Sequence, residues 1–180
     1  MKPILCWVVA LRPEADPLIS RMGLKSFDGP GKLFPLYRSR DGRTYLTISG
    51  IGRVNAGAAT AYLAASLPED GMAGWINFGI AGSGNVAYGE TFLASRIVEE
   101  GTGRAWYPGV VLPLPVGVTR AEVTTVDKPT ETYPSRGLVE MEASGFYQTA
   151  LRVSTVEFCQ VVKVVSDDPD HPVAGIDKGI

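Results

Sequence analysis

The stretch Ile4-Leu5-Cys6-Trp7-Val8-Val9-Ala10 decides the fold of this chain. A continuous apolar run of this length is typical of a β-strand buried on both faces, as at the centre of a parallel sheet. Pro13 suits the first turn of a helix, and Glu14 and Asp16 lie near the positive end of its dipole. Gly23 would end that helix. We therefore expect a central strand that leads directly into a helix.

Outward from this unit, strand-like and helix-like segments alternate. Asp41-Gly42 predicts a hairpin between residues 33–37 and 44–49. The other predicted elements are an Ala-rich helix up to Leu67, a helix at 143–151, and strands at 74–79, 90–98, 122–126, 137–141 and 159–165. This alternation predicts a single α/β domain over residues 1–180, with a central mixed, mostly parallel β-sheet flanked by helices.

Two segments lack a regular pattern. Pro113 and Pro115 break the apolar run at residues 110–118, which favours an edge or irregular segment over a central strand. Residues 128–136 contain two Pro and several Thr or Ser, and we expect an exposed loop there.

Composition excludes several classes of protein. The 180 residues are 45% hydrophobic and 20% charged, which suits one globular domain. The formal net charge of -2, with scattered Lys and Arg, offers no basic surface for nucleic acid. No apolar stretch approaches the roughly 18 residues that a membrane span needs. We expect neither a nucleic-acid partner nor a membrane span.

The cysteines and the N-terminus indicate the compartment. Cys6 and Cys159 both lie in apolar runs, where a thiol is usually a small buried hydrophobe. Met1-Lys2-Pro3 leads into a strand-like run without the pattern of a secretory signal. We expect a cytoplasmic protein with reduced thiols.

Two glycine-containing turns follow predicted strands. Ser49-Gly50-Ile51-Gly52 precedes a helix, so its amides could face an anion, but it lacks the third glycine of a dinucleotide fingerprint and the Lys of a phosphate-binding loop. We interpret it mainly as a tight strand-to-helix turn. Gly79-Ile80-Ala81-Gly82 permits either a sharp turn or close approach of the backbone to a ligand.

The sequence offers no pattern for a bound metal. His171 is the single histidine and lies beside Pro172 in a polar tail, where a solvated side chain is the simplest interpretation. Without a second His, and with both Cys in apolar runs, ligand spacing for a metal is lacking. We expect no metal and no cofactor.

Carboxylates follow three of the strand-like segments. Glu14 comes after the first apolar run, Glu140 and Glu142 lie at or just past the end of another strand-like segment, and Asp167 follows the last. A parallel α/β sheet gathers its ligand at the carboxyl ends of its strands. These side chains are therefore candidates for one site, although each taken alone is more typical of a solvated loop or a helix cap.

Five motifs in this order resemble the family of nucleoside phosphorylases and methylthioadenosine/S-adenosylhomocysteine nucleosidases. The resemblance spans nearly the whole chain. The motifs are Val8-Val9-Ala10-Leu11-Arg12-Pro13-Glu14, Ser49-Gly50-Ile51-Gly52-Arg53-Val54-Asn55-Ala56, Asn77-Phe78-Gly79-Ile80-Ala81-Gly82, Val139-Glu140-Met141-Glu142-Ala143 and Val164-Val165-Ser166-Asp167.

The resemblance implies cleavage of the N-glycosidic bond of a purine nucleoside. A purine leaves readily once N7 is protonated, and the ribose gains oxocarbenium character. The matching residues imply that Asp167 protonates or hydrogen-bonds N7, Glu142 holds the ribose hydroxyls, Met141 packs under the sugar and Glu14 activates water. The other matching residues near the substrate are Glu140, Ile80, Ala81, Gly82, Ser166 and Lys163.

The resemblance also bears on the nucleophile. Phosphorylases of this superfamily carry an Arg and a Ser for phosphate where this chain has Asn77 and Ile80. A dianion without a cationic partner is poorly held, which favours hydrolysis. Phosphorolysis of a purine or adenosyl compound, with phosphate as a second ligand, is the alternative. A non-catalytic nucleoside-binding domain is a further alternative, because fold alone does not determine function.

Some positions depart from the family pattern. Lys163 stands where the nucleosidases usually have Arg, and residues 125–129 lack the aromatic residue that normally stacks on the purine. A larger adenosyl compound, including a lipid-linked one cleaved by phosphorolysis, therefore also fits as substrate. The resemblance, together with the apolar run 110–116, predicts a homodimer.

Overall fold

A computed structural model of the protein describes residues 3–68, 72–109, 116–130 and 132–168. The strands of these residues are β1 (Ile4–Val9), β2 (Lys25–Phe27), β3 (Leu36–Arg38), β4 (Thr44–Ile48), β5 (Ala73–Gly82), β6 (Thr91–Glu99), β7 (Ala105–Trp106), β8 (Val118–Thr125), β9 (Leu138–Glu140) and β10 (Cys159–Asp167). The helices are α1 (Arg12–Arg21), α2 (Arg53–Ala65) and α3 (Ala143–Ala150), with short 3-10 turns at Pro30–Lys32 and Val156–Phe158. The described helices include none that is long and apolar enough to cross a membrane.

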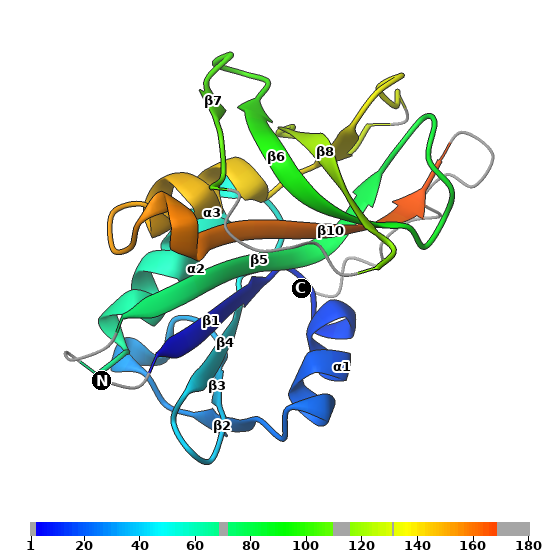
Figure 1. The fold of residues 1–180 in the computed structure, drawn as a ribbon. Coiled ribbons are helices and arrows are strands. Elements are labelled where there is room, and N and C mark those ends of the chain that lie inside the picture. The colour runs from blue at the N-terminus through cyan, green and yellow to red at the C-terminus, as the bar shows by residue number, and fades with distance from the viewer. Residues whose placement is uncertain (1–2, 69–71, 110–115, 131, 169–180) are drawn as a thin grey trace.

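The sheet is mixed and partly closed on itself. Its strand order is β10-β6-β8-β9-β5-β1-β4-β3-β2, and β10 also pairs with β5. This second pairing closes β5, β10, β6, β8 and β9 into a barrel-like ring, from which β1, β4, β3 and β2 extend as an open wing (Figure 1).

This topology corrects one prediction. The mixed α/β sheet is confirmed, and the longest pairings among the described strands are parallel, although five of the ten pairings are antiparallel. The expected open sheet is wrong, because part of the sheet closes on itself. The curled β5–β10–β6–β8–β9 part also differs from a sheet covered by helices on both faces. Pairing of β10 with both β5 and β6 joins residues far apart in sequence, which local patterns do not encode.

Helices α1 and α2 cover the two faces of the open wing, and α3 packs against α2 and the strands of the ring. Helix α1 lies on one face of β1 and β4, where Val9, Ala15 and Leu46 are fully buried. Helices α2 and α3 lie on the other side (Figure 1), where Leu63 and Phe146 join the larger hydrophobic cluster that continues into the ring. β1 is thus buried from both sides, as its unbroken apolar run predicts.

Most element positions agree with the sequence pattern. The strand at 4–10, the helix after Pro13, the hairpin around Asp41-Gly42 and the buried thiols of Cys6 and Cys159 are all confirmed. The short strands β2 and β7 were not predicted. Residues 110–115, which hold both prolines of the irregular run predicted at 110–118, and His171, in residues 169–180, lie outside the described residues.

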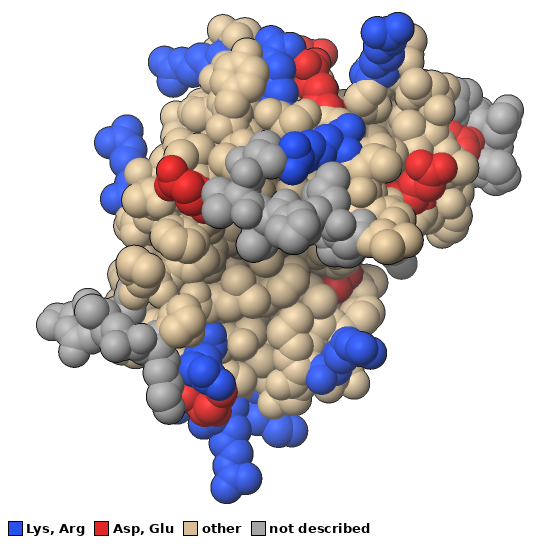
Figure 2. All heavy atoms as spheres, viewed as in Figure 1, with Lys and Arg blue, Asp and Glu red and all other residues tan. Residues whose placement is uncertain are grey.

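The surface carries no concentrated positive charge on the face shown in Figure 2. Lys and Arg side chains are scattered there among uncharged residues. This distribution agrees with the small net charge of -2.

Candidate active site

Glu14 connects the first helix to the strand at the centre of the sheet. It lies in the first turn of α1, and its Oε2 accepts a hydrogen bond of 2.8 Å from the backbone N–H of Leu11. Its Oε1 accepts one of 2.9 Å from the backbone N–H of Ile80, in β5. Each carboxylate oxygen has two lone pairs, so each can accept one more donor. The carboxylate is therefore fixed in place and still able to bind a further ligand.

Glu142 lies at the start of α3 and faces the turn before α2. Its Oε1 accepts a hydrogen bond of 2.9 Å from the backbone N–H of Gly52. Gly50 and Gly52 have φ values of 77° and 101°, a conformation that favours glycine. The turn is therefore tight, as the sequence analysis favoured. The Gly52 amide of this turn also faces an anion, namely the carboxylate of Glu142.

Glu140 holds the beginning of α3. Its two oxygens accept hydrogen bonds from the N–H groups of Glu142 and Ala143, at 2.8–3.1 Å. Thr125, at the end of β8, donates its hydroxyl to Glu140 Oε1 at 2.6 Å. First-turn amides of a helix have no partner within the helix, and a negative charge there is favourable. The described contacts thus assign Glu140 to organising the segment that carries Glu142.

Lys163 is the cation of this cluster. It lies in the middle of β10, its side chain is 1% exposed, and its Nζ is 2.8 Å from Glu140 Oε2 and 3.9 Å from Glu142 Oε2. Burial lowers the pKa of this ammonium group, but the carboxylates of Glu140 and Glu142 raise it, and the net shift is upward. Lys163 is therefore held as a cation.

Glu142 is the carboxylate whose proton affinity changes most. Burial raises its pKa, the charge of Lys163 opposes the rise, and the charge of Glu140 adds to it, so that the pKa is about 7. Desolvation penalises the charged form of a buried acid, and a single nearby ammonium shared with Glu140 compensates only partly. Glu142 consequently exchanges its proton close to neutral pH.

Gly79 leaves the space in which Glu14 and Lys163 approach each other. A Cβ atom on Gly79 would lie 3.1 Å from Glu14 Oε1 and 3.5 Å from Lys163 Nζ. The first distance is shorter than ordinary van der Waals contact. Gly79 therefore lets Glu14 lie beside the cluster of Glu140, Glu142 and Lys163. Of the two interpretations of Gly79–Gly82, the sharp turn is wrong, because these residues lie within β5.

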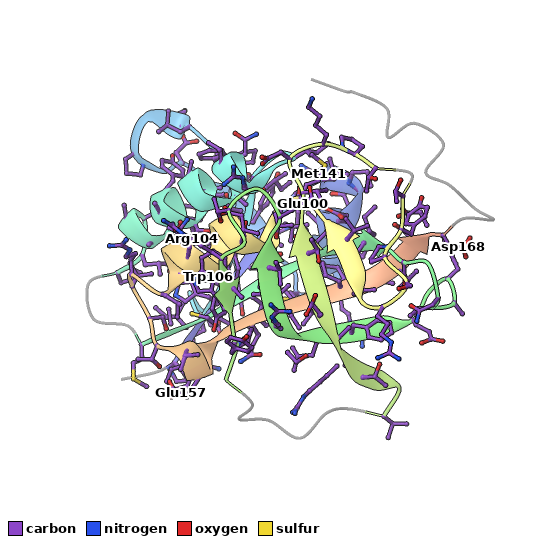
Figure 3. All side chains as sticks on the ribbon, turned by 90° about the horizontal axis from the view of Figure 1, so that it is seen from above. Glu100, Arg104, Trp106, Met141, Glu157 and Asp168 are labelled. Carbon is purple, nitrogen blue, oxygen red and sulfur yellow. The ribbon has the colours of Figure 1, made fainter. Side chains whose placement is uncertain are left out.

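Asp167 lies at the last position of β10 and is 7% exposed. Figure 3 labels Glu157, in the 3-10 turn before this strand, and Asp168, the residue after it. The hydroxyl of Ser166 donates to Asp167 Oδ1 at 2.6 Å. A Cβ atom on Gly82 would lie only 2.5 Å from Asp167 Oδ2, so the absence of a side chain at Gly82 leaves room for this carboxylate. β10 thus carries both Lys163 and Asp167.

The remaining predicted residues lie around these groups. Ala81 is buried beside Gly82, whereas Ile80 and Ser166 are partly exposed. Met141 follows β9, is partly exposed, and is labelled in Figure 3. Asn77 is buried, and its side-chain amide donates to the carbonyl of Val8 at 3.0 Å. Asn77 is therefore engaged with β1.

The site contacts of Thr125 and Tyr133 were not predicted, and the amides of the Gly50–Gly52 turn were expected only as a possible contact with an anion. The partner of the Gly52 amide, Glu142, lies 90 residues away in sequence, and that of the Thr125 hydroxyl, Glu140, lies 15 residues away, so no local pattern identifies these pairs. Tyr133 falls in the segment expected to be an exposed loop, yet it is partly buried against Gly82. A cavity of about 540 Å³ opens beside it, lined by Thr124, Val126, Pro129, Tyr133, Pro134 and Val139 among others.

Comparison with known proteins supports the fold. No protein-family model matches the sequence. No curated protein matches it either. Among solved structures, a 5′-methylthioadenosine/S-adenosylhomocysteine nucleosidase from Colwellia psychrerythraea in complex with adenine is similar, with a TM-score of 0.76 and 20% identity over 95% of this chain and 86% of that one.

Two further solved structures are also similar to this chain. The nucleosidase from Neisseria meningitidis in complex with methylthio-immucillin-A has a TM-score of 0.72 and 21% identity, over 94% of this chain and 89% of that chain. A mutant of the Helicobacter pylori futalosine hydrolase has a TM-score of 0.70 and 13% identity, over 94% and 89%. The chain therefore has the fold of the methylthioadenosine/S-adenosylhomocysteine nucleosidases.

Proposed function

We propose that this protein hydrolyses the N-glycosidic bond of a purine nucleoside of the adenosyl type. The observation that carries the proposal is the approach of the partly buried Glu14 and the buried Lys163 to each other at Gly79. Glu142 lies 3.9 Å from Lys163, and Asp167 lies on the same strand as Lys163. Desolvated carboxylates are costly unless they are compensated. Here backbone amides, hydroxyls and one ammonium group compensate them, which is the arrangement of a preorganised site.

The chemistry divides among three carboxyl groups. Asp167 supplies a proton to N7 of the purine, so that the base accepts the electron pair of the breaking C1′–N9 bond and leaves neutral. Glu142 accepts hydrogen bonds from the ribose hydroxyls, and these strengthen as positive charge develops on the sugar. Glu14 accepts a proton from the water that attacks C1′. The products are free purine and ribose carrying the original 5′ group.

Hydrolysis fits the described residues better than phosphorolysis. Lys163 is the cation of the cluster, and Glu140 occupies it at 2.8 Å. Asn77 points its amide at the carbonyl of Val8. A phosphate dianion beside Glu14 would thus meet a carboxylate without an unoccupied cation among the described contacts, which is unfavourable.

The similar structures support this reaction and this class of substrate. They include nucleosidases bound to adenine and to methylthio-immucillin-A, and a futalosine hydrolase. At identities of 13–21%, these similarities do not define the 5′ group of the substrate. The proposal therefore names the bond cleaved and the purine class.

Base release from a panel of adenosyl and inosyl compounds, with and without phosphate, tests the proposal. We expect free purine in phosphate-free buffer. Turnover that requires phosphate and accumulates ribose 1-phosphate would establish phosphorolysis instead. No base release from any compound, with the protein folded, would favour a non-catalytic binding domain.

We also propose a homodimer that works in the cytoplasm without metal or cofactor. The buried free thiols of Cys6 and Cys159 suit a reducing compartment. The described residues include no group of three or more His, Cys, Asp or Glu placed to hold a metal ion. Sedimentation at micromolar concentration tests the dimer, and activity after exhaustive chelation tests the independence from metal.

A further inference from the structure

We infer that Arg53 is a positioning residue for Glu142. Its guanidinium group, held between Asp127 and Glu99, keeps the Gly52 amide against the carboxylate of Glu142. The inference rests on the proposed function for the role of Glu142, which there binds the ribose hydroxyls. Arg53 is the first residue of α2 and directly follows Gly52.

The guanidinium group of Arg53 binds two carboxylates. Its Nε donates to Asp127 Oδ1 at 2.6 Å and its Nη2 to Asp127 Oδ2 at 3.3 Å, so this pair is bidentate. Its Nη1 donates to Glu99 Oε1 at 2.5 Å. The side chain of Glu99 is 5% exposed, whereas that of Asp127 is 58% exposed. Arg53 thus joins a buried anion to one at the surface, and its hydrogen bonding lowers the pKa of Asp127.

Both partners of Arg53 belong to strand ends of the ring. Glu99 is the last residue of β6 and lies opposite Thr125 of β8, whose hydroxyl binds Glu140. Asp127 lies two residues beyond the end of β8. Arg53 therefore anchors the start of α2 to the strand ends beside Glu140.

The turn before α2 depends on such an anchor. Gly50 and Gly52 both have positive φ, and glycine has more conformational freedom than any other residue. A cavity of about 220 Å³ borders Arg53 and Gly57, so packing does not enclose the beginning of α2 on this side. The paired guanidinium group restricts the turn here.

The start of α2 contacts the start of α3 at two points. The N–H of Gly52 donates to Glu142 Oε1 at 2.9 Å. A Cβ atom on Gly145 would lie only 1.8 Å from the carbonyl oxygen of Arg53, so the two backbones are already in contact there. A loosened α2 can therefore move only away from α3, which lengthens the hydrogen bond from Gly52 to Glu142.

The pKa of Glu142 reports the position of this amide. The charged groups that act on the Glu142 carboxylate are Lys163 of β10, Glu140 of β9 and Glu14 of α1. The hydrogen bond from Gly52 favours the charged form and lowers the pKa. Lengthening that bond therefore raises the pKa of Glu142, whether or not a substrate is present.

Carbon NMR of isotope-labelled glutamate carboxyl groups measures this pKa in the whole chain. The signal of Glu142 is identified by its absence in Glu142→Gln, and the pH is varied across the interval in which the carboxyl group titrates. Wild type should titrate with a pKa of about 7. The measurement needs no turnover.

Two variants separate positioning from charge. Arg53→Lys keeps the positive charge but loses the planar fork that spans both carboxylates. Asp127→Ala removes a negative charge together with the bidentate pair. Both should raise the pKa of Glu142 by about 0.5 to 1, the contribution of one weakened hydrogen bond. Charge acting through space alone would leave this pKa unchanged in Arg53→Lys and lower it in Asp127→Ala.

Two controls make the test specific. Asp127→Glu retains a carboxylate for Arg53 and should return the pKa of Glu142 to within about 0.3 of wild type. Asp41→Ala removes a comparable surface pair, because Asp41 binds Arg43 at 2.9 Å and is 56% exposed. It lies in the turn between β3 and β4 and should leave the pKa of Glu142 unchanged. Circular dichroism of every variant shows whether it is folded.

The outcomes are separable from those of the proposed function. An unchanged pKa of Glu142 in Arg53→Lys, or a lower one in Asp127→Ala, overturns the inference even if wild type releases purine from nucleosides. A raised pKa in both variants, with both controls at the wild-type value, supports it. The same rise without base release from any nucleoside supports the positioning of Glu142 and contradicts the proposed hydrolysis.

Discussion

The ammonium group of Lys163 lies 2.8 Å from a carboxylate oxygen of Glu140, and both side chains are 1% exposed. A pair so deeply buried has lost its hydration, and its attraction must offset that loss. Thr125 and two backbone amides complete the coordination of Glu140. The pair thus fixes the β9–α3 junction. The Nζ of Lys163 is farther from Glu142, at 3.9 Å from its Oε2.

Lys163→Met should destabilise the protein by about 3–5 kcal/mol, because it leaves the buried carboxylate of Glu140 uncompensated. Urea unfolding at neutral pH measures the difference. Lys32→Met is the matched control, since Lys32 pairs with Asp28 at 2.8 Å but both side chains are more than 70% exposed. That control should change stability by less than about 1 kcal/mol. Equal effects of the two substitutions would contradict the role of the buried pair.

Asp167→Asn should lower kcat by about 10²- to 10⁴-fold, the usual contribution of general acid catalysis, and change KM little. The amide is nearly isosteric with the carboxyl group but does not supply the proton for N7. Steady-state base release measures both constants. A kcat close to that of wild type in a folded variant would exclude Asp167 as the acid and would favour the binding-domain alternative.

Gly79→Ala should lower kcat by about tenfold to a hundredfold, because its Cβ would lie 3.1 Å from Glu14 Oε1 and displace the proposed water base. Gly74→Ala is the control in the same strand, where the nearest atom to the new Cβ is 3.7 Å away. Glu14→Gln should abolish hydrolysis while a nucleoside analogue still binds. Full activity of Gly79→Ala would show that the position of Glu14 is not critical.

Glu142→Gln should remove a pH dependence of stability. The pKa of Glu142 is raised from 4.5 to about 7, so the folded protein holds this proton more tightly than the unfolded chain. The stabilisation is complete below about pH 4.5 and is lost as the pH rises through about 7, an effect of up to about 3 kcal/mol.

The measurement is the free energy of unfolding in urea at about pH 5 and about pH 8. Wild type should lose more stability than Glu142→Gln across this interval, and Glu90→Gln, at an exposed position, should follow wild type. Parallel pH profiles of wild type and Glu142→Gln would show that the proton is not held there. The proposed hydrogen bonds of Glu142 with the ribose hydroxyls are a separate role. Because Glu142→Gln weakens them, it should also raise KM.

The sequence predicted the elements better than their pairing. The apolar run of β1, the Pro13 start of α1 and the Asp41-Gly42 turn are local signals, and the structure agrees with each. Closure of the ring depends on β10 pairing with both β5 and β6, which no local pattern reports. β2 and β7, of three and two residues, are too short to show a period.

For the site, sequence identified the acidic residues but not what they contact. Glu140 and Glu142 are two positions apart and look alike in sequence, yet one binds helix amides and Lys163 and the other accepts the Gly52 amide. These roles depend on which distant groups meet them in the fold. Tyr133 was overlooked for the same reason, because its neighbour Gly82 is about fifty residues earlier in the chain.

The hydrogen bond from the Ile80 N–H to Glu14 has a consequence for how this site can vary. The contribution of Ile80 is a peptide group that every residue except proline possesses. Side-chain scanning at position 80 would therefore leave the bond intact, whereas an ester in place of that amide would delete it. Proteins of this fold with quite different side chains at the position of Ile80 would still form this hydrogen bond. An alignment of their sequences would therefore not reveal it.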